Sequence, residues 1–154
     1  MESLFVYNWQ VRDEWFKVCG ELSEQQLRQE RIGGVGSILN TFFHIVDVES
    51  SWIREIEGLE DLEPSLEAHM TLDDVKALSD QYRVTLKEIL LQSTAKNEDR
   101  IVKVSWQEES YSYGEVLRHV IAHEIHHIGQ LSVWAKEIGI ERVSANFIGR
   151  GLSC

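Results

Sequence analysis

The stretch that decides the fold is VIAHEIHHIGQ, which runs from Val120 to Gln130. It places three histidines and one glutamate within five consecutive positions of an apolar series with helical spacing. A capping box of Ser112 and Glu115 opens this series, and Gly139, a residue type common just after helix C-termini, closes it. The sequence therefore predicts one helix about 39 Å long, the longest element of the fold.

Three further amphipathic segments precede this helix. They run from about Leu4 to Cys19, from Ser37 to near Gly58, and from Thr71 through Leu90, with Ser37 and Thr71 as predicted N-caps. Four such helices with little strand predict an all-α fold, a four-helix bundle, in a single domain of residues 1–154. The connection between the second and third helices has about a dozen residues, which is long enough for a crossover, so simple up-and-down order is not guaranteed.

A short β-hairpin is also predicted, just before the last helix. The segments RIVKVSW, Arg100 to Trp106, and ESYSY, Glu109 to Tyr113, alternate with period two on either side of a polar turn. Because an isolated two-stranded ribbon is only marginally stable, this hairpin is a minor addition to a helical fold.

Composition and charge exclude several functional classes. The chain has 15 Lys and Arg against 26 Asp and Glu, and its few cations are scattered, which disfavours nucleic-acid binding. No apolar run approaches the roughly 18 residues of a membrane span, and the N-terminus lacks the basic segment of a secretory signal. Cys19 and Cys154 form neither a disulfide framework nor a metal-ligand pair. We therefore expect a cytoplasmic protein with no nucleic-acid or membrane partner.

The last predicted helix presents two histidines on one face. At about 100° per residue, His123 and His127 point with the apolar residues, at one margin of the apolar stripe. Imidazoles four residues apart can share a divalent cation, and apolar neighbours lower their pKa, which keeps the nitrogens free to coordinate at neutral pH. The alternative is a pair of core-edge histidines bonded to backbone or water. His119 and His126 fall outside the stripe and are expected to be solvated or to contact the ligands from outside.

A catalytic metal usually takes a third protein ligand and keeps one position open. The remaining histidines are His44 and His69. His69 lies in an apparent loop before a helix cap, whereas His44 lies inside the second helix, at the edge of its apolar stripe. Helical placement favours His44, because a rigid element holds a ligand more precisely than a loop does, but periodicity does not force this choice.

Two other interpretations of the histidine-rich stretch meet obstacles. The pattern H-E-x-x-H at His123, Glu124 and His127 is the zinc-peptidase signature, but no histidine follows His127 to supply the downstream ligand. A di-iron carboxylate site needs a second Glu-x-x-His, and Thr41 stands where that glutamate would precede His44. A three-histidine site across two helices remains.

Two segments, FFHIVDVESSWI and LRHVIAHEIHHIGQL, resemble the DinB-like superfamily of small bacterial metal-binding proteins. That family has a histidine, acidic residues and Trp on its second helix, and an H-x-x-x-H-R-G-Q-like run on its last. The matching positions here are His44, Asp47, Glu49, Trp52, His123, His127, Gly129 and Gln130. Ile128 stands where arginine is common in the family. This difference puts in doubt a contact that the arginine would make around the ligands, but the three histidine ligands themselves are present. The resemblance covers nearly the whole chain.

The resemblance implies a left-handed four-helix bundle, often a homodimer, that binds a divalent ion through His44, His123 and His127. Zinc is the expected ion, with nickel, manganese or iron as alternatives. The implied activities are metal-dependent hydrolysis and transfer of low-molecular-weight thiols onto electrophiles, so we expect an enzyme acting on small molecules, a thiol S-transferase or a hydrolase. The alternative is a non-catalytic binding or stress-response protein whose metal is structural or absent.

Three polar residues complete the expected site. Glu49 and Glu124 fall near the middle of the apolar faces of their helices. A buried carboxylate needs a partner, so each would orient a histidine ring, and Glu124 would act as a base; alternatively each reaches solvent past its aliphatic stem. Gln130, which belongs to the family motif, is expected to contact the ligands from outside.

Overall fold

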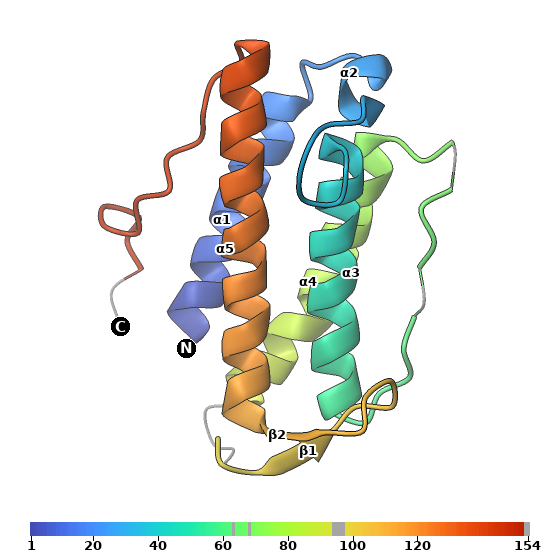
Figure 1. The fold of residues 1–154 in the computed structure, drawn as a ribbon. Coiled ribbons are helices and arrows are strands. Elements are labelled where there is room, and N and C mark those ends of the chain that lie inside the picture. The colour runs from blue at the N-terminus through green and yellow to red at the C-terminus, as the bar shows by residue number, and fades with distance from the viewer. Residues whose placement is uncertain (63, 68, 94–97, 153–154) are drawn as a thin grey trace.

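The computed structural model describes residues 1–62, 64–67, 69–93 and 98–152 of the chain, and Figure 1 shows its fold. Long helices dominate these residues, and a small two-stranded sheet accompanies them. In chain order the elements are α1 (Glu2–Cys19), α2 (Glu24–Arg28), α3 (Ile38–Ile56), α4 (Leu72–Ser93), β1 (Ile101–Lys103), β2 (Ser110–Ser112) and α5 (Tyr113–Ile138). The predicted all-α bundle and the hairpin before its last helix are both confirmed.

The bundle contains a crossover. Figure 1 shows α1 and α5 running in one direction while α3 and α4 both run in the other, so the two middle helices are parallel. The connection from Glu57 to Thr71 carries the chain back along the bundle between them. Each long helix packs against two other long helices: α5 lies against α1 and α3, and α4 lies against the same two helices. The last helix therefore faces α3 along most of its length.

Local sequence signals account for the helix boundaries. Ser112 Oγ accepts a hydrogen bond from the Glu115 backbone N–H, and Glu115 Oε2 accepts one from the Ser112 backbone N–H, which completes the predicted capping box of α5. The helix ends at Gly139, whose φ of 75° is the left-handed conformation that glycine adopts without strain. Ser37 caps α3 as predicted. The five-residue helix α2 was not predicted, although Ser23 and Gln26 form a capping box there as well.

The hairpin closes one end of the bundle. Strands β1 and β2 pair antiparallel with Val102 opposite Tyr111. Val102 and Val104 are buried and pack with residues of the helices, so the ribbon is stabilised by the bundle on which it lies. The Tyr113 N–H donates to the Arg100 carbonyl and continues the pairing into the first turn of α5. The hairpin thereby fixes where the last helix begins.

A buried polar cluster joins all four long helices. We call its members, Trp9 and Arg12 of α1, Glu49 of α3, Ser79 of α4 and Glu124 of α5, the Arg12 cluster. The Arg12 guanidinium donates to both Glu124 oxygens at 2.7 and 2.5 Å, to Glu49 Oε2 at 2.9 Å and to Ser79 Oγ at 3.1 Å. Trp9 Nε1 donates to Glu49 Oε1 at 2.8 Å. The two carboxylates therefore share one cation inside the bundle.

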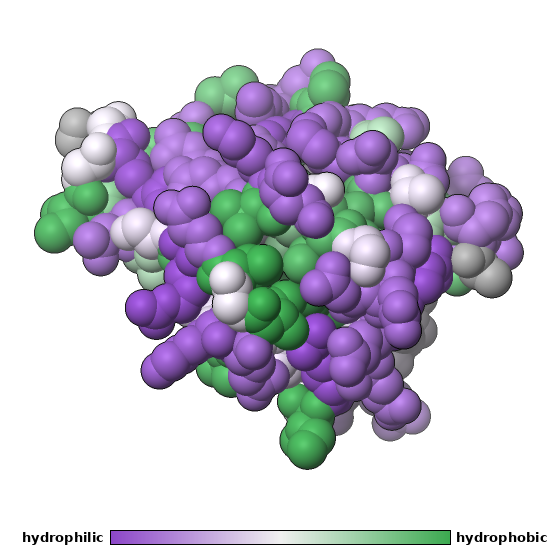
Figure 2. Space-filling model, turned by 90° about the horizontal axis from the view of Figure 1, so that it is seen from above, coloured by the Kyte–Doolittle hydropathy of each residue, from purple (hydrophilic) through white to green (hydrophobic). Residues whose placement is uncertain are grey.

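The surface of the end that carries α2 is mostly hydrophilic. Figure 2 shows this end, with apolar side chains gathered near its centre and polar residues around them. Among the described residues, no helix combines the length and the apolar run that crossing a bilayer requires.

Candidate metal centre

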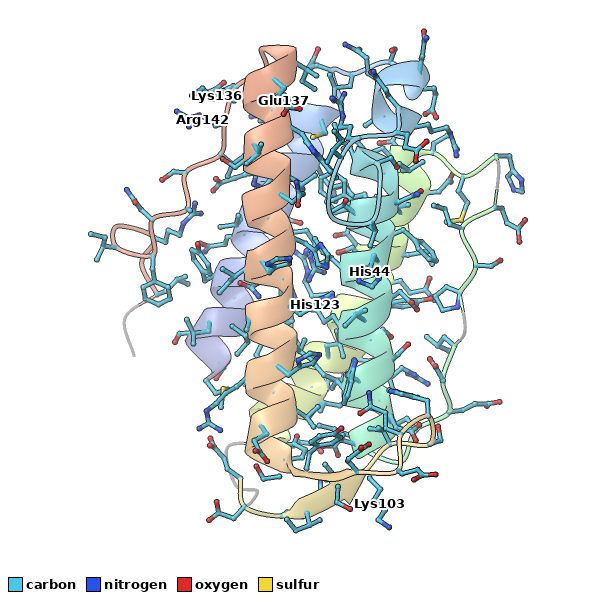
Figure 3. All side chains as sticks on the ribbon, in the orientation of Figure 1. His44, Lys103, His123, Lys136, Glu137 and Arg142 are labelled. Atoms are coloured by element: carbon cyan, nitrogen blue, oxygen red, sulfur yellow. The ribbon has the colours of Figure 1, made fainter. Side chains whose placement is uncertain are left out.

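The structure brings three histidine rings together between α3 and α5. His44 comes from α3, and His123 and His127 come from successive turns of α5. Figure 3 shows His44 and His123 facing each other across the space between the two helices. His127 is buried, and the other two side chains are half-buried. Helical spacing predicted that His123 and His127 share one face of α5, and the structure places His44, the third histidine expected from the family resemblance, beside them.

The nitrogen atoms lie at distances that suit a shared cation. His44 Nε2 and His123 Nε2 are 3.0 Å apart, His123 Nε2 and His127 Nε2 are 3.2 Å apart, and all three ligand atoms lie within 4.8 Å of one another. Nitrogens bound at about 2.0–2.1 Å to a tetrahedral zinc ion are separated by about 3.3 Å. A neutral imidazole carries a single N–H, so one proton on His123 Nε2 can bridge only one of its two close contacts. A divalent ion satisfies all three lone pairs at once.

The histidines are held in the neutral form that coordination requires. Burial, with the neighbouring His127 and His44, lowers the pKa of His123 to about 3. Burial likewise lowers the pKa of His127 to about 4, with His44 contributing. Burial lowers the pKa of His44, and the nearby negative charge of Asp47 offsets part of this decrease. Since protons do not compete for these nitrogens near pH 7, the donor set fits a divalent metal such as zinc.

The other histidines of α5 border the site from the solvent side. His119 and His126 are both exposed, as their positions outside the apolar stripe predicted. The His119 ring centroid lies 6.0 Å from that of His123, and the His126 ring centroid lies 5.2 Å from that of His127. His69 is exposed on the connection that leads into α4 and does not belong to the cluster.

Glu124 and Glu49 share a partner that lies outside the histidine group, and the expected role of Glu124 as a base stays a prediction. Both oxygens of Glu124 accept from Arg12, and the oxygens of Glu49 accept from Trp9 and Arg12. Neither carboxylate reaches solvent, since Glu124 is 1% exposed and Glu49 is 3% exposed. His127 Nδ1 is buried and finds no hydrogen-bond partner among the described residues, so neither glutamate orients that ring. The cation Arg12 is the partner that the buried carboxylates required.

The expected contact of Gln130 with the ligands stays a prediction. The Gln130 side chain packs against the turn before α3: a Cβ added to Gly33 would lie 3.1 Å from Gln130 Nε2, and one added to Gly34 would lie 3.2 Å from its Cγ. Both glycines have positive φ. The motif glutamine thus holds the Gly33–Gly34 turn against α5, where the close approach leaves little room for a larger residue.

Arg12 is the residue of this region that the sequence analysis missed. Its signal was present, because Phe5, Trp9, Arg12 and Phe16 follow the spacing i, i+4, i+7 and i+11, which places the arginine within the apolar stripe of α1. A cation in an apolar stripe, combined with two acids in the apolar stripes of other helices, indicates a buried ion-pair network.

Cys19 takes no part in the histidine site. Cys19 is buried, and burial raises the pKa of its thiol to about 12. Cys154 lies outside the described residues.

Comparison with known proteins agrees with this architecture. The family model described as "DinB family" matches residues 1–150. The chain is 49% identical to the uncharacterised protein YizA of Bacillus subtilis (strain 168) over 153 residues, which cover 99% of this chain and 96% of YizA.

Solved structures with the same fold are similar at lower identity. A DinB-like protein from Bacillus cereus ATCC 10987 has a TM-score of 0.64 at 19% identity and covers 91% of each chain. The DinB-like protein YjoA from Bacillus subtilis has a TM-score of 0.67 at 19% identity and covers 94% of this chain and 96% of its own. The family model, the sequence relative and the shared fold lead to one conclusion: the chain belongs to the DinB family.

Proposed function

We propose that this protein binds one divalent metal ion, zinc, through His44, His123 and His127 and uses it in an enzymatic reaction on small molecules. The observation that carries the proposal is the convergence of the three Nε2 atoms, with separations of 3.0 and 3.2 Å for two of the pairs. The lowered pKa values of these histidines support it, because neutral imidazoles are the form that binds metal.

The chain's own residues suit a ligand set that is rigid and open on one side. The two ligands of α5 flank Glu124, whose bidentate bond to Arg12 fixes the rotation of that helix. The described residues contribute three ligand atoms to the group, which leaves a coordination position for a small molecule. When bound, a divalent ion of this kind acts as a Lewis acid that activates a nucleophile at neutral pH. Exposed His119 and His126 border the approach to it.

We further propose a substrate of low molecular weight, with a thiol as one reactant or water as the attacking group. The family resemblance supports both thiol S-transfer and hydrolysis, and the three-nitrogen set is compatible with either.

Metal analysis of purified protein tests the binding part of the proposal. We expect one zinc per chain in the native protein and in His126→Ala, which removes an exposed histidine beside the site. His44→Ala and His127→Ala should each lose most of the metal, because two imidazoles do not hold a catalytic ion. Native metal content in both of these variants would refute the site.

A cobalt-substituted sample tests whether the ion is open to substrate. Titration with cysteine or another small thiol should change the visible spectrum of an ion with an exchangeable position. A closed structural ion would leave the spectrum unchanged, and the protein would then unfold on chelation without any thiol response. The second result would favour a non-catalytic binding protein over an enzyme.

A further inference from the structure

A cavity lies one helical turn from the histidine site, between α3, the hairpin and α5. It has a volume of 240 Å³ and is lined by Trp52, Gln107, Tyr111, Glu115, Val116 and His119. These residues come from α3, from the hairpin and from the first turns of α5. The cavity is thus formed where three separate parts of the chain meet.

Aromatic rings form its walls. The Trp52 ring centroid lies 5.0 Å from that of His119 and 6.2 Å from that of Tyr111, with the ring planes at 57° and 67°. Trp106 packs edge-on against Trp52 at 5.4 Å and supports it from outside the cavity lining. Tilted rings at these separations leave their faces and edges available to a further ring, which prefers the same offset or edge-to-face contacts.

The size and the charge of the cavity restrict what it can hold. A cavity of about 150 Å³ is enough to bind benzene, so 240 Å³ admits one substituted ring. Its lining includes the carboxylate Glu115 and neither Lys nor Arg. The net charge of the whole chain is −11. An anion is therefore disfavoured. Gln107 Oε1 accepts from the Tyr111 hydroxyl, so the Gln107 amide N–H groups remain as donors at the rim.

The cavity adjoins the histidine site through His119. Its wall residue His119 lies four residues before His123, and the two ring centroids are 6.0 Å apart. One turn of helix rises about 5.4 Å, so a ring in the cavity with a substituent a few bonds long reaches the three converging nitrogens. From these observations we propose that the cavity is the specificity pocket of the histidine site and takes an aromatic ring without negative charge, whose reactive substituent extends toward His123.

This inference rests on the proposed function for the role of the substituent, but ring binding can be measured without metal. The probes are p-cresol, tyramine and 4-hydroxyphenylacetate, which carry one phenol ring with a neutral, a positive and a negative substituent, and cyclohexylmethanol as a saturated control. Each is titrated into the full-length, metal-free protein. Binding is followed by NMR through the resonances of the probe itself and, in proteins that retain Trp52, also through the indole N–H resonance of Trp52.

We expect p-cresol and tyramine to bind and to shift the Trp52 resonance. 4-Hydroxyphenylacetate and cyclohexylmethanol should each bind at least about tenfold more weakly. The negative charge of the acetate is repelled by the acidic lining, and the saturated ring of the alcohol cannot make aromatic contacts. Trp52→Leu should weaken p-cresol binding by about tenfold, whereas Trp52→Phe retains most of it. The matched control is Phe147→Leu. Phe147 lies in the C-terminal segment, where its partly exposed ring packs on Tyr7 of α1, and its replacement should leave p-cresol binding unchanged.

Several results would overturn the pocket. They are no binding of p-cresol at millimolar concentration, equal binding of p-cresol and cyclohexylmethanol, or equal effects of Trp52→Leu and Phe147→Leu. If Trp52→Leu does not fold, Trp52→Phe and the charge series still decide the question in the same way.

A second measurement separates failure of the pocket from failure of the proposed function. In cobalt-loaded protein, benzyl mercaptan should alter the spectrum at about tenfold lower concentration than ethanethiol, and Trp52→Leu should abolish that advantage. Equal potency of the two thiols would refute the pocket while supporting the open metal. Ring binding in metal-free protein with no thiol effect on cobalt would support a ring site and refute the proposed function.

Discussion

Arg12 of α1 and Glu124 of α5 are joined by two hydrogen bonds inside the bundle, with Nε 2.7 Å from Oε1 and Nη2 2.5 Å from Oε2. Glu124 stands between His123 and His127 in the sequence. A bidentate guanidinium–carboxylate pair fixes direction as well as distance, so it sets the rotation of α5 about its axis. That rotation turns the two imidazoles toward His44 on α3. The buried Arg12–Glu124 ion pair on one side of α5 thus positions the candidate ligands His123 and His127 on another side of the same helix.

Replacing Arg12 should destabilise the protein strongly. Arg12→Met leaves Glu49 and Glu124 buried without their cation, which costs about 3–5 kcal/mol in the free energy of unfolding. Urea denaturation followed by circular dichroism measures this loss. The triple variant Arg12→Met, Glu49→Gln, Glu124→Gln carries no buried charge at these positions and should recover part of the stability. A loss below about 1 kcal/mol in Arg12→Met would show that the pair is not buried as described.

The capping box of α5 should contribute measurably to stability. Ser112→Ala removes the hydroxyl that accepts from the Glu115 N–H and should lower the free energy of unfolding by about 1 kcal/mol. Ser110→Ala, the same change at an exposed strand position two residues earlier, serves as the control and should have little effect. Equal losses in the two variants, measured by thermal denaturation, would contradict a specific role for the cap.

The Cys19 thiol should resist alkylation in the folded protein. Burial raises its pKa to about 12, so at pH 8 only about one molecule in ten thousand carries the reactive thiolate. In a Cys154→Ser background, iodoacetamide should modify Cys19 very slowly in buffer and rapidly in urea. Because the folded pKa lies above the alkaline range tested, the rate should stay low up to pH 10. Modification in buffer at the rate of a model thiol would show that Cys19 is accessible.

Much of the fold follows from local signals in the sequence. The span of α5 could be predicted because Ser112, Glu115 and Gly139 act within a turn of the helix ends they define. The helix α2 was missed since five residues give too short a window for periodicity. The length of the connection between α3 and α4 permitted a crossover but did not require one. The direction in which α4 packs depends on contacts between residues that are distant in sequence.

The site was predictable in part for the same reason. The angles around α5 placed His123 and His127 together, and rigidity favoured His44 over His69. The partner of the two buried glutamates could not be chosen from α3 and α5 alone, since Arg12 belongs to α1. The residues that line the aromatic cavity come from three separate elements, so no regular sequence spacing relates them and predicts the cavity. The homodimer suggested by the family resemblance stays a prediction, which sedimentation would test.

X-ray absorption at the zinc K-edge, recorded on zinc-loaded protein, tests the central claim most directly. Three imidazole nitrogens should appear at about 2.0–2.1 Å, with the multiple-scattering pattern of histidine rings, and His127→Ala should reduce the number of rings by one or abolish binding. A first shell that contains sulfur at about 2.3 Å, or a spectrum that is identical in His127→Ala, would contradict the proposed three-histidine site.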